Sequence, residues 1–144
     1  MSNNSMFSKG ILVALLLMVS TFGFAAGKVH KVVIQVSSSD ALIQKIALNN
    51  AVNVQKHYGA DNVKVEIVAY GPGLSLLTKK SKLSKRVESL AISEIAFSAC
   101  GNTIKKVTKK KGKKPALTAG VKVTPAGVIR IMELQGKGYA YIRP

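Results

Sequence analysis

Cys100 is the only cysteine in a chain of 144 residues, and its neighbours give it a definite setting. An apolar run, residues 95–97, leads towards it, and Asn102 and Thr103 directly after it are of the types that cap helices. The segment therefore predicts a strand, a tight turn and a helix, with Cys100 at the carboxyl end of the strand. In open α/β sheets this edge is where ligands bind. The positive end of a helix dipole there favours a thiolate, the reactive form of cysteine.

A second loop, Tyr70-Gly71-Pro72-Gly73, follows another apolar segment and should reach the same edge, as should residues 37–39. Glycines let backbone amides approach a bound atom closely. We therefore expect a small pocket beside Cys100 that suits a small anionic or sulfur species. Its predicted lining residues are Gly71, Gly73, Gly101, Asn102 and Thr103. A Gly-Pro-Gly sequence is also typical of a simple turn, so this loop alone is a weak indication.

Other catalytic constellations have little support. His30 and His57 are expected to face solvent, and no pair of histidines or cysteines has the spacing of a zinc site, so neither a metal nor a cofactor is predicted. No nucleophile elbow of the Gly-x-Ser-x-Gly type occurs. Asp40 is expected to cap a helix, and the other acidic residues to be surface charges, which argues against hydrolysis by paired carboxylates. Those other acids are Asp61, Glu66, Glu88, Glu94 and Glu133.

Apolar periodicity predicts five strands that alternate with helices. The predicted strands are residues 31–36, 63–69, 95–99, 121–123 and 139–142. Helices are expected over residues 41–58, 74–77, 83–90, 103–107 and 126–135. Thr124-Pro125 is expected to cap the last of them. Residues 105–114 are expected to form a mobile lysine-rich loop. This alternation indicates an α/β domain whose mostly parallel sheet has helices on both faces.

The N-terminal segment has the pattern of a secretory signal peptide. Lys9 is followed by the apolar run 11–19 and then by small residues, with cleavage expected after Ala25 or nearby. We therefore divide the chain into a signal peptide, residues 1–27, and one domain, residues 28–144, that is periplasmic or secreted. An apolar run extended through Phe22 and Phe24 would instead make an uncleaved anchor, but the run is short for a membrane span. The mature form is expected not to span a membrane.

The chain is strongly basic, with 22 Lys and Arg against 6 Asp and Glu and a net charge of +16. The lysines gather at residues 105–114 and 79–86. They could attract nucleic acid, anionic lipid or acidic partners, or simply keep an exported protein soluble. Aromatic residues are not interleaved with them and arginines are few, so no specific nucleic acid is predicted.

Several segments together resemble the DsrE/DsrF-like family. They are residues 32–36 with Asn49-Asn50 in the following helix, residues 65–73, residues 97–103 and residues 138–144. The resemblance implies a flavodoxin-like, three-layer α/β/α sandwich that assembles as trimers or hexamers. It also implies sulfur relay, in which a cysteine after the third strand carries a persulfide, and Cys100 occupies that position. Relay members usually work in the cytoplasm, and the basic 105–114 segment is unusual for the family.

Two functional hypotheses follow from these observations. In the first, a Cys100 thiolate accepts a sulfane sulfur from a donor protein and passes it to an acceptor protein, as a sulfurtransferase-like carrier. In the second, the protein is an oligomeric binding module without catalysis, in which Cys100 is a small, inert, buried residue beside a small-anion pocket. With no second cysteine, disulfide chemistry within the chain is impossible in either case.

Overall fold

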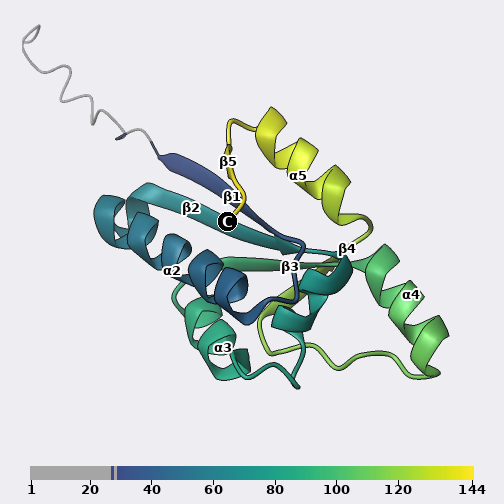
Figure 1. Ribbon diagram of the computed structural model, residues 1–144. Helices are drawn as coiled ribbons and strands as arrows, with labels where there is room; N and C mark the ends of the chain where they lie inside the picture. The colour runs from purple at the N-terminus through teal and green to yellow at the C-terminus, as the bar shows by residue number, and fades with distance from the viewer. Residues whose placement is uncertain (1–26, 28) are drawn as a thin grey trace, which may run out of the picture.

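The computed structural model describes residues 27 and 29–144, so the predicted signal peptide lies outside the described residues except for Gly27. The domain is a sheet with helices on both faces (Figure 1). Its strands are β1 (His30–Val36), β2 (Val63–Ala69), β3 (Ala96–Cys100), β4 (Val121–Thr124) and β5 (Ala140–Ile142). They lie in the order β4-β3-β2-β1-β5, and all four pairings are parallel. The predicted α/β class is confirmed, and the sheet is fully parallel.

The helix that connects β1 to β2 shows how local sequence determines where a helix begins and ends. Helix α2 (Ala41–Tyr58) begins after Asp40, whose carboxylate accepts hydrogen bonds from the backbone N–H groups of Leu42 and Ile43 at 2.7 and 3.0 Å. These bonds satisfy donors that a helix leaves free in its first turn. The helix ends at Gly59, whose φ of 85° favours glycine. The predicted bounds of this helix and the capping role of Asp40 are both confirmed.

The two faces of the sheet bury different sets of apolar side chains. On one face, Ile34, Ile67 and Phe97 pack with Leu48 of α2 in the larger cluster. Helices α3 (Ser84–Ile92) and α4 (Gly101–Lys111) cover the same side, each through a buried residue of that cluster. On the other face, the smaller cluster of Val33, Val68, Ile131 and Leu134 lies beneath α5 (Gly127–Gly136). Strands covered on both faces read as continuous apolar runs, as β1 and β2 do.

Three segments differ from the sequence-based expectation. Residues 71–77 form a 3-10 helix, η2 (Gly71–Leu77), and a second short 3-10 turn, η1 (Ala60–Asn62), precedes β2. Helix α4 starts at Gly101 and continues through most of the lysine run to Gly112, whose φ of 67° ends it. The mobile-loop prediction for residues 105–114 was therefore wrong as far as Lys111. Lysine is a good helix former, and consecutive lysines are tolerated where the side chains project into solvent.

The start of α5 also differs, because Ala126 rather than Thr124-Pro125 occupies the N-cap position and no side chain caps the helix. Its first N–H groups are therefore free to serve another acceptor.

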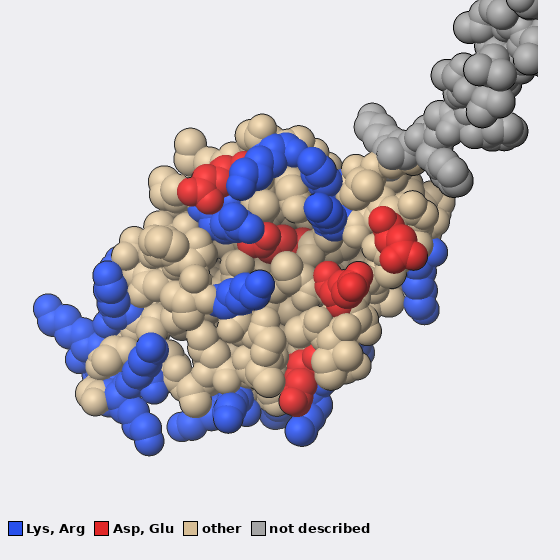
Figure 2. Space-filling view, turned by 180° about the vertical axis from the view of Figure 1, so that it is seen from behind, with Lys and Arg blue, Asp and Glu red and all other residues tan. Residues whose placement is uncertain are grey.

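Charge is unevenly distributed over this surface. In the view from behind, Lys and Arg side chains project from the end of the molecule at which α4 lies and also occur along its other edges, whereas most acidic side chains lie in the middle and towards the opposite end (Figure 2). No acidic residue occurs between Glu94 and Glu133, so α4 and β4 contain none. All charged side chains of α4 and β4 are therefore basic.

Candidate functional site

Cys100 is the last residue of β3 and the N-cap residue of α4, as the strand–turn–helix prediction requires. Its side chain is buried, with 5% of the residue exposed. Side chains alternate along a strand, so Cys100 shares the sheet face of Ser98, whereas Ala99 belongs to the core cluster on the α2 side. The thiol therefore points towards the face that α5 covers.

Two helices begin at this thiol. Helix α4 starts one residue after Cys100, and the first residue of α5, Gly127, contributes a backbone N–H to the sulfur. Backbone N–H groups of Asn102 and Thr103 in α4 and the side chain of Thr103 also surround the sulfur. These donors surround the sulfur without closing a regular side-chain cap bond between Cys100 and α4. A thiolate is a much stronger acceptor for the same donors.

The pKa of Cys100 is lowered from its ordinary value. Burial is the largest single influence and raises the pKa, because it disfavours the charged form. Hydrogen bonding from the Thr103 side chain and from the N–H groups of Gly127, Thr103 and Asn102 outweighs burial and lowers it. Lys105 and Lys106 are not among these causes. Donors at two helix N-termini thus favour the thiolate of a cysteine that is nearly closed to solvent.

Thr103 links the two predicted loops of the pocket. The backbone N–H of Gly71 donates to Thr103 Oγ1 at 2.9 Å, which leaves the Thr103 hydroxyl proton free to point at the sulfur of Cys100. A hydroxyl that already accepts a hydrogen bond is a better donor, because the bonds polarise one another. The structure therefore brings Gly71 and Thr103 to Cys100 in one hydrogen-bonded chain.

Gly101 and Asn102 hold the turn after Cys100 against the segment that leads into α5. The N–H of Asn102 also donates to the carbonyl oxygen of Pro125 at 3.2 Å. A Cβ on Gly101 would lie 3.1 Å from the carbonyl oxygen of Thr124. Such a separation is tight for a side chain, so glycine lets the two segments meet.

Gly73, which is predicted to line the pocket, packs closely against the end of β1. It is buried, and a Cβ there would lie 2.1 Å from the carbonyl oxygen of Val36. Glycine at this position lets η2 pack directly on the end of β1. Gly73 therefore serves backbone packing under the loop and is not among the groups that influence the sulfur.

Sequence reasoning missed Gly127, although it contacts the site most closely from α5. A Cβ on Gly127 would lie 3.0 Å from Cβ of Tyr70 and 3.3 Å from Cβ of Cys100. No local pattern marked this residue, because its partners are 57 and 27 positions away in the sequence. The one available sign was a glycine within the first turn of a predicted helix, where glycine is a poor helix former.

Glu66 is not a surface charge, which corrects the prediction made for it. It is 5% exposed, and its carboxylate accepts two hydrogen bonds from the guanidinium of Arg130, each of 2.8 Å. Ser98 also donates to the same carboxylate at 2.7 Å. A buried carboxylate requires such partners, and here they come from β3 and α5. The pKa of Arg130 is raised, first through its hydrogen bond to Glu66, so the guanidinium stays charged.

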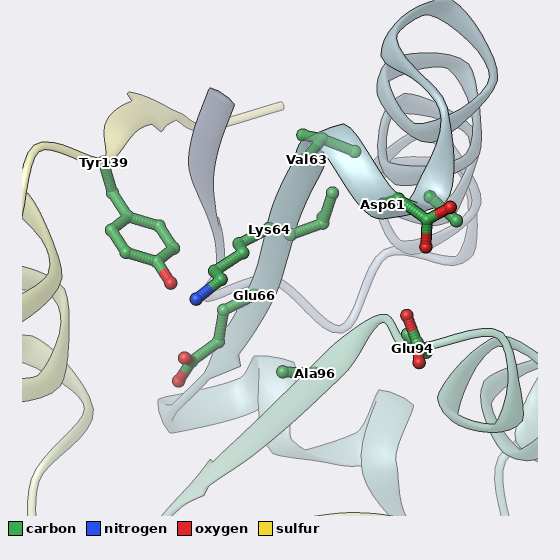
Figure 3. Close-up of a pocket in the computed structure, with 9 residues that line it drawn as sticks. Asp61, Val63, Lys64, Glu66, Glu94, Ala96 and Tyr139 are labelled. Carbon is green, nitrogen blue, oxygen red and sulfur yellow. The ribbon is translucent and has the colours of Figure 1, made fainter. Parts of the chain in front are cut away.

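Cys100 lines neither of two cavities in the surface of the domain. One, of about 400 Å³, lies at the amino ends of β2 and β3 (Figure 3). The hydroxyl of Tyr139 and the amino group of Lys64 point towards one another there, above Glu66, while Asp61 and Glu94 lie at the other side (Figure 3). The second, of about 510 Å³, lies between α4 and β4. The groups described around Cys100 form a cluster of donors at a buried sulfur.

Both histidines contact the same tyrosine ring. His30 stacks on Tyr58 with ring centroids 3.8 Å apart, and His57 lies edge-on to the same ring. Among the described residues, no group of three His, Cys, Asp or Glu side chains could hold a metal ion. In that same part of the chain no helix is long and apolar enough to cross a membrane.

The fold and the site define a class of protein: a five-stranded, fully parallel α/β domain with one thiol at the carboxyl edge of its third strand, between two helix N-termini. The chain belongs to the DsrE/DsrF-like family, whose sequence profile matches residues 30–144. This family is associated with sulfur relay, and its members often oligomerise.

A solved structure has the same fold. The chain is 31% identical to MTH1491 from Methanobacterium thermoautotrophicum, a protein described as being of unknown function, with a TM-score of 0.71. The similarity covers 80% of this chain and 99% of MTH1491. Among curated proteins, none matches the sequence.

Proposed function

We propose that the protein is a sulfur carrier that holds a sulfane sulfur as a persulfide on Cys100 and passes it to a partner. The observation that carries this proposal is the ring of donors at the sulfur, from Gly127, Thr103 and Asn102, which lowers the pKa of a buried thiol. A cysteine that only fills apolar space would have a raised pKa, because burial would act alone.

The chemistry needs one nucleophile and no change in net oxidation state. The Cys100 thiolate attacks the outer sulfur of a donor persulfide, the donor's S–S bond breaks, and the donor leaves as a thiolate. The product, Cys100–S–S⁻, carries the negative charge on its outer sulfur, where the Thr103 hydroxyl and the helix N–H groups can stabilise it. An acceptor thiolate then attacks that outer sulfur and releases Cys100 as a thiolate.

The lack of a second cysteine supports transfer between molecules. Cys100 is free, and the chain supplies no resolving thiol that could remove the sulfur as an internal disulfide. A donor and an acceptor must therefore be separate partners, which is the arrangement that a relay requires.

Mass spectrometry of the folded protein tests the proposal. The purified protein is incubated with inorganic polysulfide, and the intact mass is compared for wild type, Cys100→Ser and Cys100→Ala. We expect wild type to gain the mass of one sulfur atom and to lose it on addition of a thiol acceptor, and both variants to gain none. Sulfur loading in Cys100→Ser, or none in wild type, would rule out the carrier function.

The alternative is a binding module in which Cys100 is inert, and the 5% exposure of this residue favours it. Alkylation of native protein with iodoacetamide separates the two functions. A carrier is expected to react faster as pH rises through a depressed pKa, whereas an inert cysteine reacts only after denaturation.

We further propose that residues 1–27 are a cleaved signal peptide, that the protein is periplasmic or secreted, and that it forms a trimer or hexamer. The apolar run 11–19 and the small residues after it support export. Exposed apolar side chains on α5, Val128, Ile129 and Met132, are available for a contact between subunits. N-terminal sequencing of exported protein and sedimentation analysis test these two points.

A further inference from the structure

The cavity between α4 and β4 combines an apolar floor with a basic rim. It has a volume of about 510 Å³, and its lining residues are Gly101, Ile104, Lys105, Thr108, Lys109, Lys114 and Val123. Small-molecule sites typically have volumes of roughly 300–1,000 Å³. The cavity is therefore large enough to hold one small ligand.

Helical spacing places its α4 residues on one side of the helix. Gly101, Ile104, Lys105 and Thr108 recur at intervals of three and four residues, and Lys109 follows Lys105 by one turn. Lys106 and Lys110 have the same spacing but lie on the opposite side of α4 and do not line the cavity. The same helix thus carries both the cavity lysines and a matched pair away from it.

The floor is apolar and partly open to solvent. Ile104 is 5% exposed, whereas Val123, on the edge strand β4, is 54% exposed although it lies in the cavity. An exposed β-branched residue beside a hollow is a surface that an apolar ligand would cover.

The charge of this cavity has one sign. None of its lining residues is acidic, and in the described part of the chain the ion pairs involve only Lys85, Arg130 and their carboxylate partners. The ammonium groups of Lys105, Lys109 and Lys114 are therefore free to bind an external anion.

The cavity is separate from the thiol. Val123 pairs with Ala99, which faces the core on the α2 side, whereas Cys100 faces α5. A ligand in the cavity would lie on the opposite face of the sheet from the sulfur. The cavity therefore does not depend on the sulfur-carrier function.

We propose that this cavity binds a monomeric amphiphilic anion, a single alkyl chain with a carboxylate head. The alkyl chain would cover Val123 and Ile104, and the head would lie among Lys105, Lys109 and Lys114. Charge complementarity selects an anion, and the apolar floor selects a chain over a small inorganic ion.

Fluorescence titration with dansyl-labelled undecanoate, below its micelle concentration and at physiological salt, tests the proposal. We expect saturable binding with a blue shift in emission.

The variant Lys105→Gln/Lys109→Gln should bind about tenfold more weakly, as expected for two partly screened charge pairs. The matched variant Lys106→Gln/Lys110→Gln, with the same net charge, should lose less than about twofold. Val123→Thr, nearly isosteric, should weaken binding about fourfold through one lost buried methyl group.

Four outcomes would overturn the proposal. They are absence of binding, equal weakening by the two lysine pairs, equal affinity for the neutral dansyl-labelled alcohol, and a Lys105→Gln/Lys109→Gln protein whose sedimentation shows a changed oligomeric state. The last would assign the cavity to a contact between copies. Capture by anionic phosphatidylglycerol vesicles without binding of the monomeric probe would likewise assign the lysines to a membrane surface and reject the cavity site. Cys100→Ser should bind the probe as wild type does.

Discussion

Glu66 of β2 and Arg130 of α5 bind each other through two hydrogen bonds of 2.8 Å, and this pair fixes the helix that reaches the thiol. Arg130 lies one turn after Gly127, whose N–H contributes to the lowered pKa of Cys100. The ion pair therefore helps to hold α5, whose first N–H faces the sulfur of Cys100, without touching the sulfur itself.

Arg130→Met is expected to destabilise the fold and to weaken the site. Loss of the guanidinium leaves the buried Glu66 carboxylate with Ser98 as its remaining side-chain partner, which should lower the free energy of unfolding by about 3 kcal/mol. Urea denaturation measures this loss. The double variant Glu66→Gln/Arg130→Met should lose less, because no buried charge is left unpaired. A double variant as unstable as the single one would show that the ion pair is not the cause.

Thr103→Val is expected to raise the pKa of Cys100, because one hydrogen bond that favours the thiolate is lost. The rate of iodoacetamide alkylation as a function of pH measures this shift. Thr103→Ser keeps the hydroxyl that accepts from Gly71 and should behave as wild type does. If valine and serine variants had the same pH profile, the hydroxyl would have no part in stabilising the thiolate.

Gly127→Ala is expected to move the start of α5 away from the thiol. The new Cβ would lie 3.0 Å from Tyr70 and 3.3 Å from Cβ of Cys100, so the helix or these neighbours must move by a few tenths of an ångström. We expect a loss of about 1–3 kcal/mol in unfolding free energy from overpacking and a higher Cys100 pKa. Gly136→Ala is the matched control in α5, since nothing lies within 4 Å of its added Cβ. This control should be neutral or stabilising, and equal losses in both variants would contradict the crowding argument.

Stability should depend on pH through Cys100. Its native pKa is depressed, so the native state releases the proton at a lower pH than the unfolded chain does. The thiolate therefore adds stability as pH rises through the native pKa, and the gain is complete above the unfolded pKa of about 8.5. As pH falls through the native pKa, this contribution is lost. Urea denaturation of wild type and Cys100→Ser across this range should show a growing difference in favour of wild type; a constant difference would indicate an unshifted thiol.

Local patterns in the sequence determined most of the elements. The alternation of apolar strands with helices gave the α/β class, Asp40 gave the start of α2, and Gly59 its end, because these signals act over a few residues. The position of Cys100 between a strand and a helix was predictable for the same reason. The apparent loop at residues 105–111 was misread, because lysine-rich solvated sequence and a solvated helix have the same composition.

The tertiary structure alone decided what surrounds the sulfur and what neutralises Glu66. Gly127 reaches Cys100 because β4 pairs with β3, so the last residue of β4 lies beside Cys100. The segment that follows β4 then leads directly into α5, which covers that face of the sheet. Arg130 and Ser98 meet Glu66 across 64 and 32 residues of sequence. Hydrogen bonds between distant residues leave no periodic trace in the chain, since they depend on which strands become neighbours. The sequence by itself thus placed the thiol at an edge, and only the folded sheet supplied the donors that lower its pKa.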